Sequence, residues 1–70
     1  MLPLSCASPG EECVIRRIGG SKEVRKHLEN LGFVPGGSVS VITAMDGNVI
    51  VRVKEARVAI SDEMARKIMI

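Results

Sequence analysis

The 70-residue sequence predicts one mostly β domain, 1–70, built as a small and strongly bent β barrel. One helix is expected after the first strand and a short helix at the C-terminus. Two observations carry this prediction. Short runs of alternating Val and Ile, separated by tight turn signals, are typical of short strands in a compact sheet. The hydrophobic content is 46% with Phe33 as the single aromatic residue, so the core is expected to be aliphatic.

The first strand is expected over Cys13 to Ile18, after a turn signal at 8–10. Cys13 and Ile15 share one face because side chains alternate along a strand. Ile18 is out of phase with them, and a bulge near Arg16-Arg17 would return it to the inside.

The first helix is expected to begin after Ser21, a favourable N-cap residue, and to end at Gly32, with Pro35 following as a stop. Its apolar stripe follows the spacing i, i+4, i+7 and consists of Val24, Leu28 and Leu31. A helix of about three turns needs a sheet to pack on.

Three further strands are expected over 38–44, 49–54 and 57–60, joined by a hairpin at Asp46-Gly47 and a tight turn at Glu55-Ala56. Their inward residues are expected to be Val39, Val41 and Thr43, then Val49, Val51 and Val53, then Val58 and Ile60.

Ser61 is expected to cap the terminal helix, with acidic residues in its first turn and Arg66-Lys67 in its last. The apolar stripe of this helix is expected to consist of Met64, Ala65 and Ile68.

The net charge of +2 is close to balanced, and the basic pairs Arg16-Arg17, Arg25-Lys26 and Arg66-Lys67 are spread along the sequence. We therefore expect dispersed, solvated charge and no nucleic-acid partner, since nucleic-acid binders usually concentrate basic residues on one face. The lack of aromatic residues also disfavours base stacking. A barrel that binds RNA remains a remote alternative, which salt-dependent binding would reveal.

No catalytic motif is present, and His27 has no evident partner for acid–base work, so no enzymatic activity is expected. The candidate metal ligands are Cys6, Cys13 and His27. The two cysteines are too far apart for a structural zinc hook, so neither a metal site nor a cofactor is expected. Weak surface binding of a divalent transition metal by Glu11-Glu12 or Asp62-Glu63 stays open.

The chain shows neither a signal peptide nor an apolar run long enough to span a bilayer, which predicts a cytoplasmic protein with free thiols.

Protein docking is the remaining function that the sequence favours. Val14, Ile42 and Ile50 lie on strand faces opposite the inferred core, and Arg16 and Arg52 are expected beside them. An apolar group rimmed by arginine is typical of an interaction site. The alternative, that the helices simply cover these residues, is equally open.

These residues also resemble a known family, the FeoA-type domain, over Leu4 to Ile70. The matching motifs are Leu4-Ser5 with Gly10, Cys13-x-Ile15-x-x-Ile18, Gly20, Leu28-x-x-Leu31-Gly32-Phe33-x-Pro35-Gly36, Val39-x-Val41, Gly47, Val51-x-Val53, Arg57-Val58-Ala59-Ile60 and Ala65-x-x-Ile68. The chain departs from the family pattern at Ala7, Glu55 and Ser61. Glu55 stands where a glycine is usual in the last hairpin.

The resemblance implies an SH3-like barrel and a role in ferrous iron uptake, through contact with the cytosolic part of the FeoB-type membrane transporter. It implies no ligand residues. Two alternatives accompany it. One is a carrier or sensor domain that binds Fe²⁺ or Zn²⁺ directly. The other is a regulatory domain like the SH3-like domain that ends some metal-dependent repressors.

Overall fold

The computed structural model describes residues 1–70 and contains short strands, two α-helices and one 3₁₀ turn. In chain order these are η1 (Leu4–Cys6), β1 (Glu12–Val14), β2 (Arg17–Ile18), α1 (Lys22–Asn30), β3 (Ser38–Met45), β4 (Asn48–Val53), β5 (Ala56–Ser61), α2 (Asp62–Ala65) and β6 (Ile68–Met69). The mostly β class, the helix before the long strands and the short helix near the C-terminus are confirmed.

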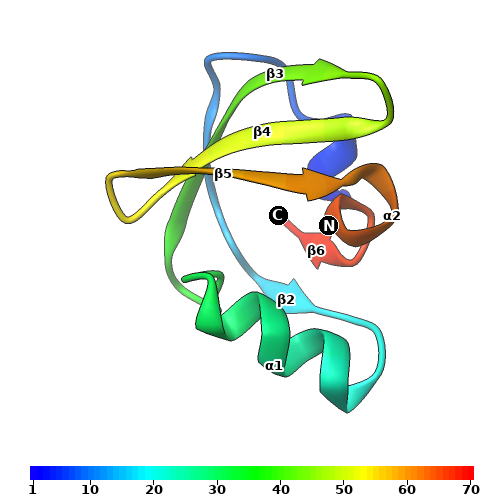
Figure 1. The fold of residues 1–70 in the computed structure, drawn as a ribbon. Coiled ribbons are helices and arrows are strands. Elements are labelled where there is room, and N and C mark those ends of the chain that lie inside the picture. The colour runs from blue at the N-terminus through cyan, green and yellow to red at the C-terminus, as the bar shows by residue number, and fades with distance from the viewer.

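The strands form two antiparallel sheets (Figure 1). The larger sheet has the strand order β1-β3-β4-β5, and the smaller one pairs β2 with β6. The bent sheet is therefore not closed by a continuous ladder of hydrogen bonds. β2 and β6 lie across from the larger sheet, with α1 beyond β2 (Figure 1).

The predicted strand from Cys13 to Ile18 is wrong as a single strand. β1 pairs with β3, whereas β2 pairs with β6 in the other sheet. The intervening Ile15 is held by the loop before β3, since its N–H donates to Gly37 O at 2.8 Å and its carbonyl accepts from Gly36 N at 2.7 Å. These bonds extend the β1-β3 pairing, and from Arg16 onward the chain bonds to β6 instead, near the position where a bulge was expected.

The helix α1 confirms both of its predicted ends. The Ser21 hydroxyl oxygen accepts from the Val24 N–H at 3.2 Å, which is the expected N-cap bond. At the other end Gly32 has φ +108°. Its N–H donates to Glu29 O at 2.9 Å, and the Phe33 N–H donates to Leu28 O at 2.9 Å. This pair of bonds is the Schellman motif, which requires a residue that tolerates positive φ.

The strand β3 contains a bulge that the sequence analysis missed. Val41 pairs with Val51, but Thr43 pairs with Ile50, so Ile42 is an extra residue in β3. Thr43 therefore lies opposite the half-buried Ile50 and not on the inner face with Val41, and the prediction of an inward Thr43 is wrong.

The two hairpin turns have similar geometry but different residues. Asp46 and Gly47 form the expected turn, with φ of 51° and 78°. The second turn is formed by Lys54 and Glu55, with φ of 50° and 65°, one residue earlier than the predicted turn at Glu55-Ala56. Positive φ at both central residues is the pattern of a type I′ hairpin, which matches the twist of the flanking strands.

The terminal helix is shorter than predicted. The Ser61 hydroxyl accepts from the Met64 N–H at 3.1 Å, as expected for a cap. The helix α2 ends at Ala65, and Arg66 and Lys67 follow it. Ile68 lies in β6, where it pairs with Ile18, so its predicted place on a helical stripe is wrong.

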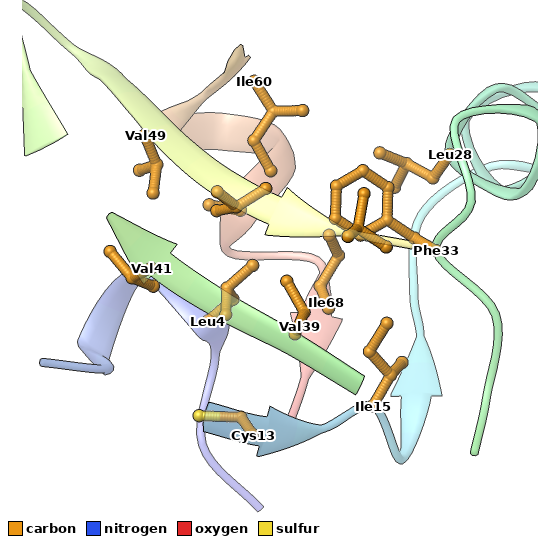
Figure 2. Close-up of a cluster of buried hydrophobic side chains, with 13 residues drawn as sticks. Leu4, Cys13, Ile15, Leu28, Phe33, Val39, Val41, Val49, Ile60 and Ile68 are labelled. Atoms are coloured by element: carbon orange, nitrogen blue, oxygen red, sulfur yellow. The ribbon is translucent and has the colours of Figure 1, made fainter. Parts of the chain in front are cut away.

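The core is a single cluster of buried hydrophobic side chains between the two sheets and α1 (Figure 2). It consists of Leu4, Cys13, Ile15, Leu28, Phe33, Val39, Val41, Val49, Val51, Val53, Ile60, Ala65 and Ile68. Every member except Cys13 and Phe33 is aliphatic, as predicted. Val24, Leu31 and Val58 pack against the cluster while remaining half-buried.

Candidate functional site

The outer sheet face is the side of the β1-β3-β4-β5 sheet that points away from the core, and it carries four of the five residues expected to bind a partner. Alternation along β1 places Val14 here, between the buried Cys13 and Ile15, and its side chain is 51% exposed. The same alternation along β4 places Ile50 and Arg52 on this face, since Val49, Val51 and Val53 are buried.

The bulge in β3 makes the apolar part of this face compact. Ile42 and Thr43 both stand opposite Ile50, and Ala59 of β5 lies on the other side of Ile50. Ile42 and Ile50 are half-buried, and neither belongs to the side chains that pack against the core. The bulge therefore gathers an apolar patch on the outside of the sheet.

Arginines border this patch on one side. Arg52 pairs directly with Arg57 across β4 and β5, and both side chains are exposed. Like charges directly opposite each other in a sheet are unfavourable unless an anion binds between them. Both ion pairs of the protein lie elsewhere, from Asp62 to Arg66 at 2.8 Å and from Glu63 to Lys67 at 3.9 Å. The apolar patch thus has a positive rim without internal carboxylate partners.

Arg16 is the one expected site residue that lies elsewhere. Its backbone N–H donates to Met69 O of β6 at 2.8 Å, so Arg16 lies outside the large sheet, next to β2. There it lines a different hollow from the one that Arg52 lines. The expected arrangement, with Arg16 and Arg52 flanking one apolar group, is therefore not what the fold produces.

The second surface is a basic hollow of about 580 Å³ between β2 and α1. Its charged lining residues are Arg16, Arg17, Lys22, Arg25, Lys26 and Glu29. The expectation of dispersed charge is wrong for the first two basic pairs, because the fold brings them to the same hollow. They are separated by a turn and half a helix in the sequence, so only the docking of α1 beside β2 reveals this convergence.

The candidate metal ligands do not form a cluster. No group of three or more His, Cys, Asp or Glu side chains is placed to hold an ion. Cys13 is buried at 9% exposure, whereas Cys6 is exposed. Burial raises the pKa of the Cys13 thiol above its ordinary value, and a 3.6 Å contact with the Glu11 carboxylate adds to the shift. A thiol that resists ionisation is a poor metal ligand.

None of the helices has the length and apolar character of a membrane span, since α1, the longer of the two α-helices, has nine residues.

Comparison with known proteins shows what the whole chain is similar to. The sequence profile of the FeoA domain matches residues 2–70. A protein of Methanocaldococcus jannaschii, named Fe(2+) transport protein A, is 33% identical over 70 residues, which cover 100% of this chain and 85% of that protein.

Solved structures share the fold. A crystal structure of an iron uptake regulatory protein (FeoA) superposes with a TM-score of 0.89 at 32% identity, over 97% of this chain and 90% of that one. Iron(II) transport protein A from Clostridium thermocellum also gives 0.89, at 24% identity, over 97% of this chain and 43% of that one. A manganese-dependent transcriptional repressor gives 0.85 at 17% identity, over 94% of this chain and 38% of that one, a likeness of fold alone. The SH3-like character of the domain is thereby confirmed.

Proposed function

The chain belongs to the FeoA domain family, and we propose that it is a non-catalytic accessory protein of ferrous iron transport. It docks on the cytosolic region of an FeoB-type transporter and modulates uptake from the cytoplasmic side. The relative from M. jannaschii and the similar crystal structure are both named for iron transport or uptake, which supports this role.

One observation supports docking as the mode of action. The outer sheet face holds the apolar patch of Ile42 and Ile50 beside the arginine pair Arg52 and Arg57. Protein interfaces commonly combine a small apolar centre with arginine, which contributes a large share of binding energy in such sites. We therefore assign Val14, Ile42, Ile50 and Arg52 to the transporter-binding surface, with Arg16 contributing from a separate hollow.

A metal carrier or sensor is the less favoured alternative. It would need several ligands in one place, and Cys6, Cys13 and His27 do not converge. Weak divalent-metal binding by surface carboxylates is compatible with docking.

Calorimetric titration of the chain with the purified cytosolic region of an FeoB-type transporter tests the proposal. We expect Ile50→Asp to weaken binding by at least about tenfold, because it places a charge in a contact that loses water. Arg52→Glu should weaken binding as well. Leu2→Asp is the matched control, since Leu2 is 60% exposed and lies beside Ile70, outside the large sheet.

Circular dichroism shows whether each variant keeps its fold. If the folded Ile50→Asp and Arg52→Glu variants both bind as tightly as the wild type, the outer sheet face is not the docking surface. If the wild type shows no heat of binding and no complex by gel filtration, the transporter is not its partner.

A further inference from the structure

We propose that the basic hollow between β2 and α1 binds an acidic segment of a partner protein. The inference deepens the proposed function, since it assigns a chemical class to the part of the transporter that enters this hollow. Five of the ten Lys and Arg residues in the chain line it, against the single carboxylate of Glu29.

The cations of the hollow are not neutralised within the molecule. Both ion pairs of the protein join residues of α2 to residues directly after it, and neither involves a residue of the hollow. Surface cations gathered without carboxylate partners repel one another and raise the local positive potential. An anionic occupant would relieve this repulsion.

The cations form two facing walls. Lys22, Arg25 and Lys26 share one face of α1 with Glu29, because their spacing of three, four and seven residues returns to the same side of a helix. Arg16 and Arg17 form the opposite wall. A segment lying in the hollow would therefore meet arginine on both sides, and arginine can bind a carboxylate with two parallel hydrogen bonds.

The edge of β2 also suits a polypeptide. β2 is hydrogen-bonded in a sheet only to β6, so its other edge is unpaired, and Figure 1 places α1 beyond that edge. An extended segment can bond to such an edge through its main chain. Ile18 and Pro35 add apolar contacts at the same place.

A nucleic acid fits the hollow less well. Proteins that bind single strands usually stack bases on exposed aromatic rings. Phe33 is the only aromatic residue of the chain, and although it borders the hollow its side chain is fully buried. The charge of the hollow therefore lacks the stacking surface that bases require.

The test is an amide NMR titration of the isotope-labelled chain with a short synthetic peptide of alternating Glu and Ala. A peptide with Gln in place of Glu is the uncharged control. We expect the Glu peptide to shift resonances of 16–18 and 22–29, and the Gln peptide to shift none. Arg25→Glu with Lys26→Glu should weaken binding by about tenfold, since each reversal replaces attraction by repulsion. Arg16→Glu probes the opposite wall.

The matched control is Lys54→Glu with Arg66→Glu, which changes the net charge equally at two exposed positions outside the hollow. We expect it to alter affinity by no more than about twofold. If both double variants weaken binding equally, general charge attraction explains the result and the proposal fails. It also fails if inorganic phosphate or single-stranded RNA shifts the same resonances more strongly than the Glu peptide.

This test separates the inference from the proposed function. Binding of the transporter region with no peptide shifts in the hollow would overturn the inference and leave the proposed function standing. Peptide shifts in the hollow without any binding of the transporter region would support the inference and overturn the proposed function.

Discussion

Individual side chains show how burial decides what this protein can do. Phe33, at the end of α1, is fully buried and fills the space between that helix and the sheets (Figure 2). Cys13 faces the same core from β1, and burial raises the pKa of its thiol. Cys13 and Phe33 therefore serve packing, while the arginines remain at the surface.

Replacing Phe33 should abolish most of the stability. A Phe→Ala change in a core costs about 3–5 kcal/mol. At about 0.05–0.15 kcal/mol per residue, the free energy of unfolding of a chain this size is comparable to that loss. We expect Phe33→Ala to be largely unfolded and Phe33→Leu to retain a cooperative transition in urea. A Phe33→Ala protein with near-native stability would contradict its central place in the core.

We expect the free energy of unfolding to fall at high pH because of the Cys13 thiol. Its pKa in the folded state lies above the ordinary value of 9.0, chiefly because of burial and further because of Glu11 and Glu12. Well below pH 9 the thiol is protonated in both the folded and the unfolded state. Above it the unfolded chain loses the proton first, so the free energy of unfolding decreases as the pH rises.

Urea titrations under reducing conditions at pH about 7.5 and about 10 measure this fall. Cys13→Ala should reduce the difference between the two pH values, whereas Cys6→Ala, at an exposed position, should preserve it. An equal fall in all three proteins would show that Cys13 does not titrate abnormally.

At the scale of elements, the predictions that held rest on local signals. Ser21 and Ser61 cap their helices as expected, and Asp46-Gly47 forms its hairpin, because each depends on neighbours within a few residues. The prediction at 13–18 failed because the chain changes partners there: Ile15 bonds to the loop before β3, whereas Arg16 bonds to Met69 of β6. Ile68 lies in a strand and not on the predicted helical stripe, because it pairs with Ile18 of β2. The local periodicity of the sequence does not predict such long-range pairings.

The second hairpin should gain stability from a glycine. Glu55 adopts φ 65°, which costs an L-residue about 1–2 kcal/mol relative to a right-handed conformation. Glu55→Gly should relieve most of that strain and raise the free energy of unfolding by about 1 kcal/mol. Gly47→Glu is the reciprocal control at the equivalent position of the first hairpin, and it should lower the free energy of unfolding by a similar amount. A destabilised Glu55→Gly protein would mean that the Glu55 side chain makes a stabilising contact that outweighs the strain.

At the scale of the whole molecule, the candidate site was only partly predictable. Alternation along the strands was enough to place Val14, Ile50 and Arg52 on the outer sheet face. The basic hollow was missed because Arg16-Arg17 and Arg25-Lys26 meet only when α1 lies beside β2. A protein with an aliphatic core and two charged surfaces can act through its exterior, and an accessory role in ferrous iron transport accords with that design.

The most direct test of this account is an amide NMR map of the labelled wild-type chain with the unlabelled cytosolic region of an FeoB-type transporter. We predict that the shifted resonances concentrate on the outer faces of β3 and β4, around Ile42, Ile50 and Arg52, and in the basic hollow between β2 and α1. An unchanged spectrum at saturating concentration, or shifts confined to α2 and the hairpin at Asp46-Gly47, would contradict it.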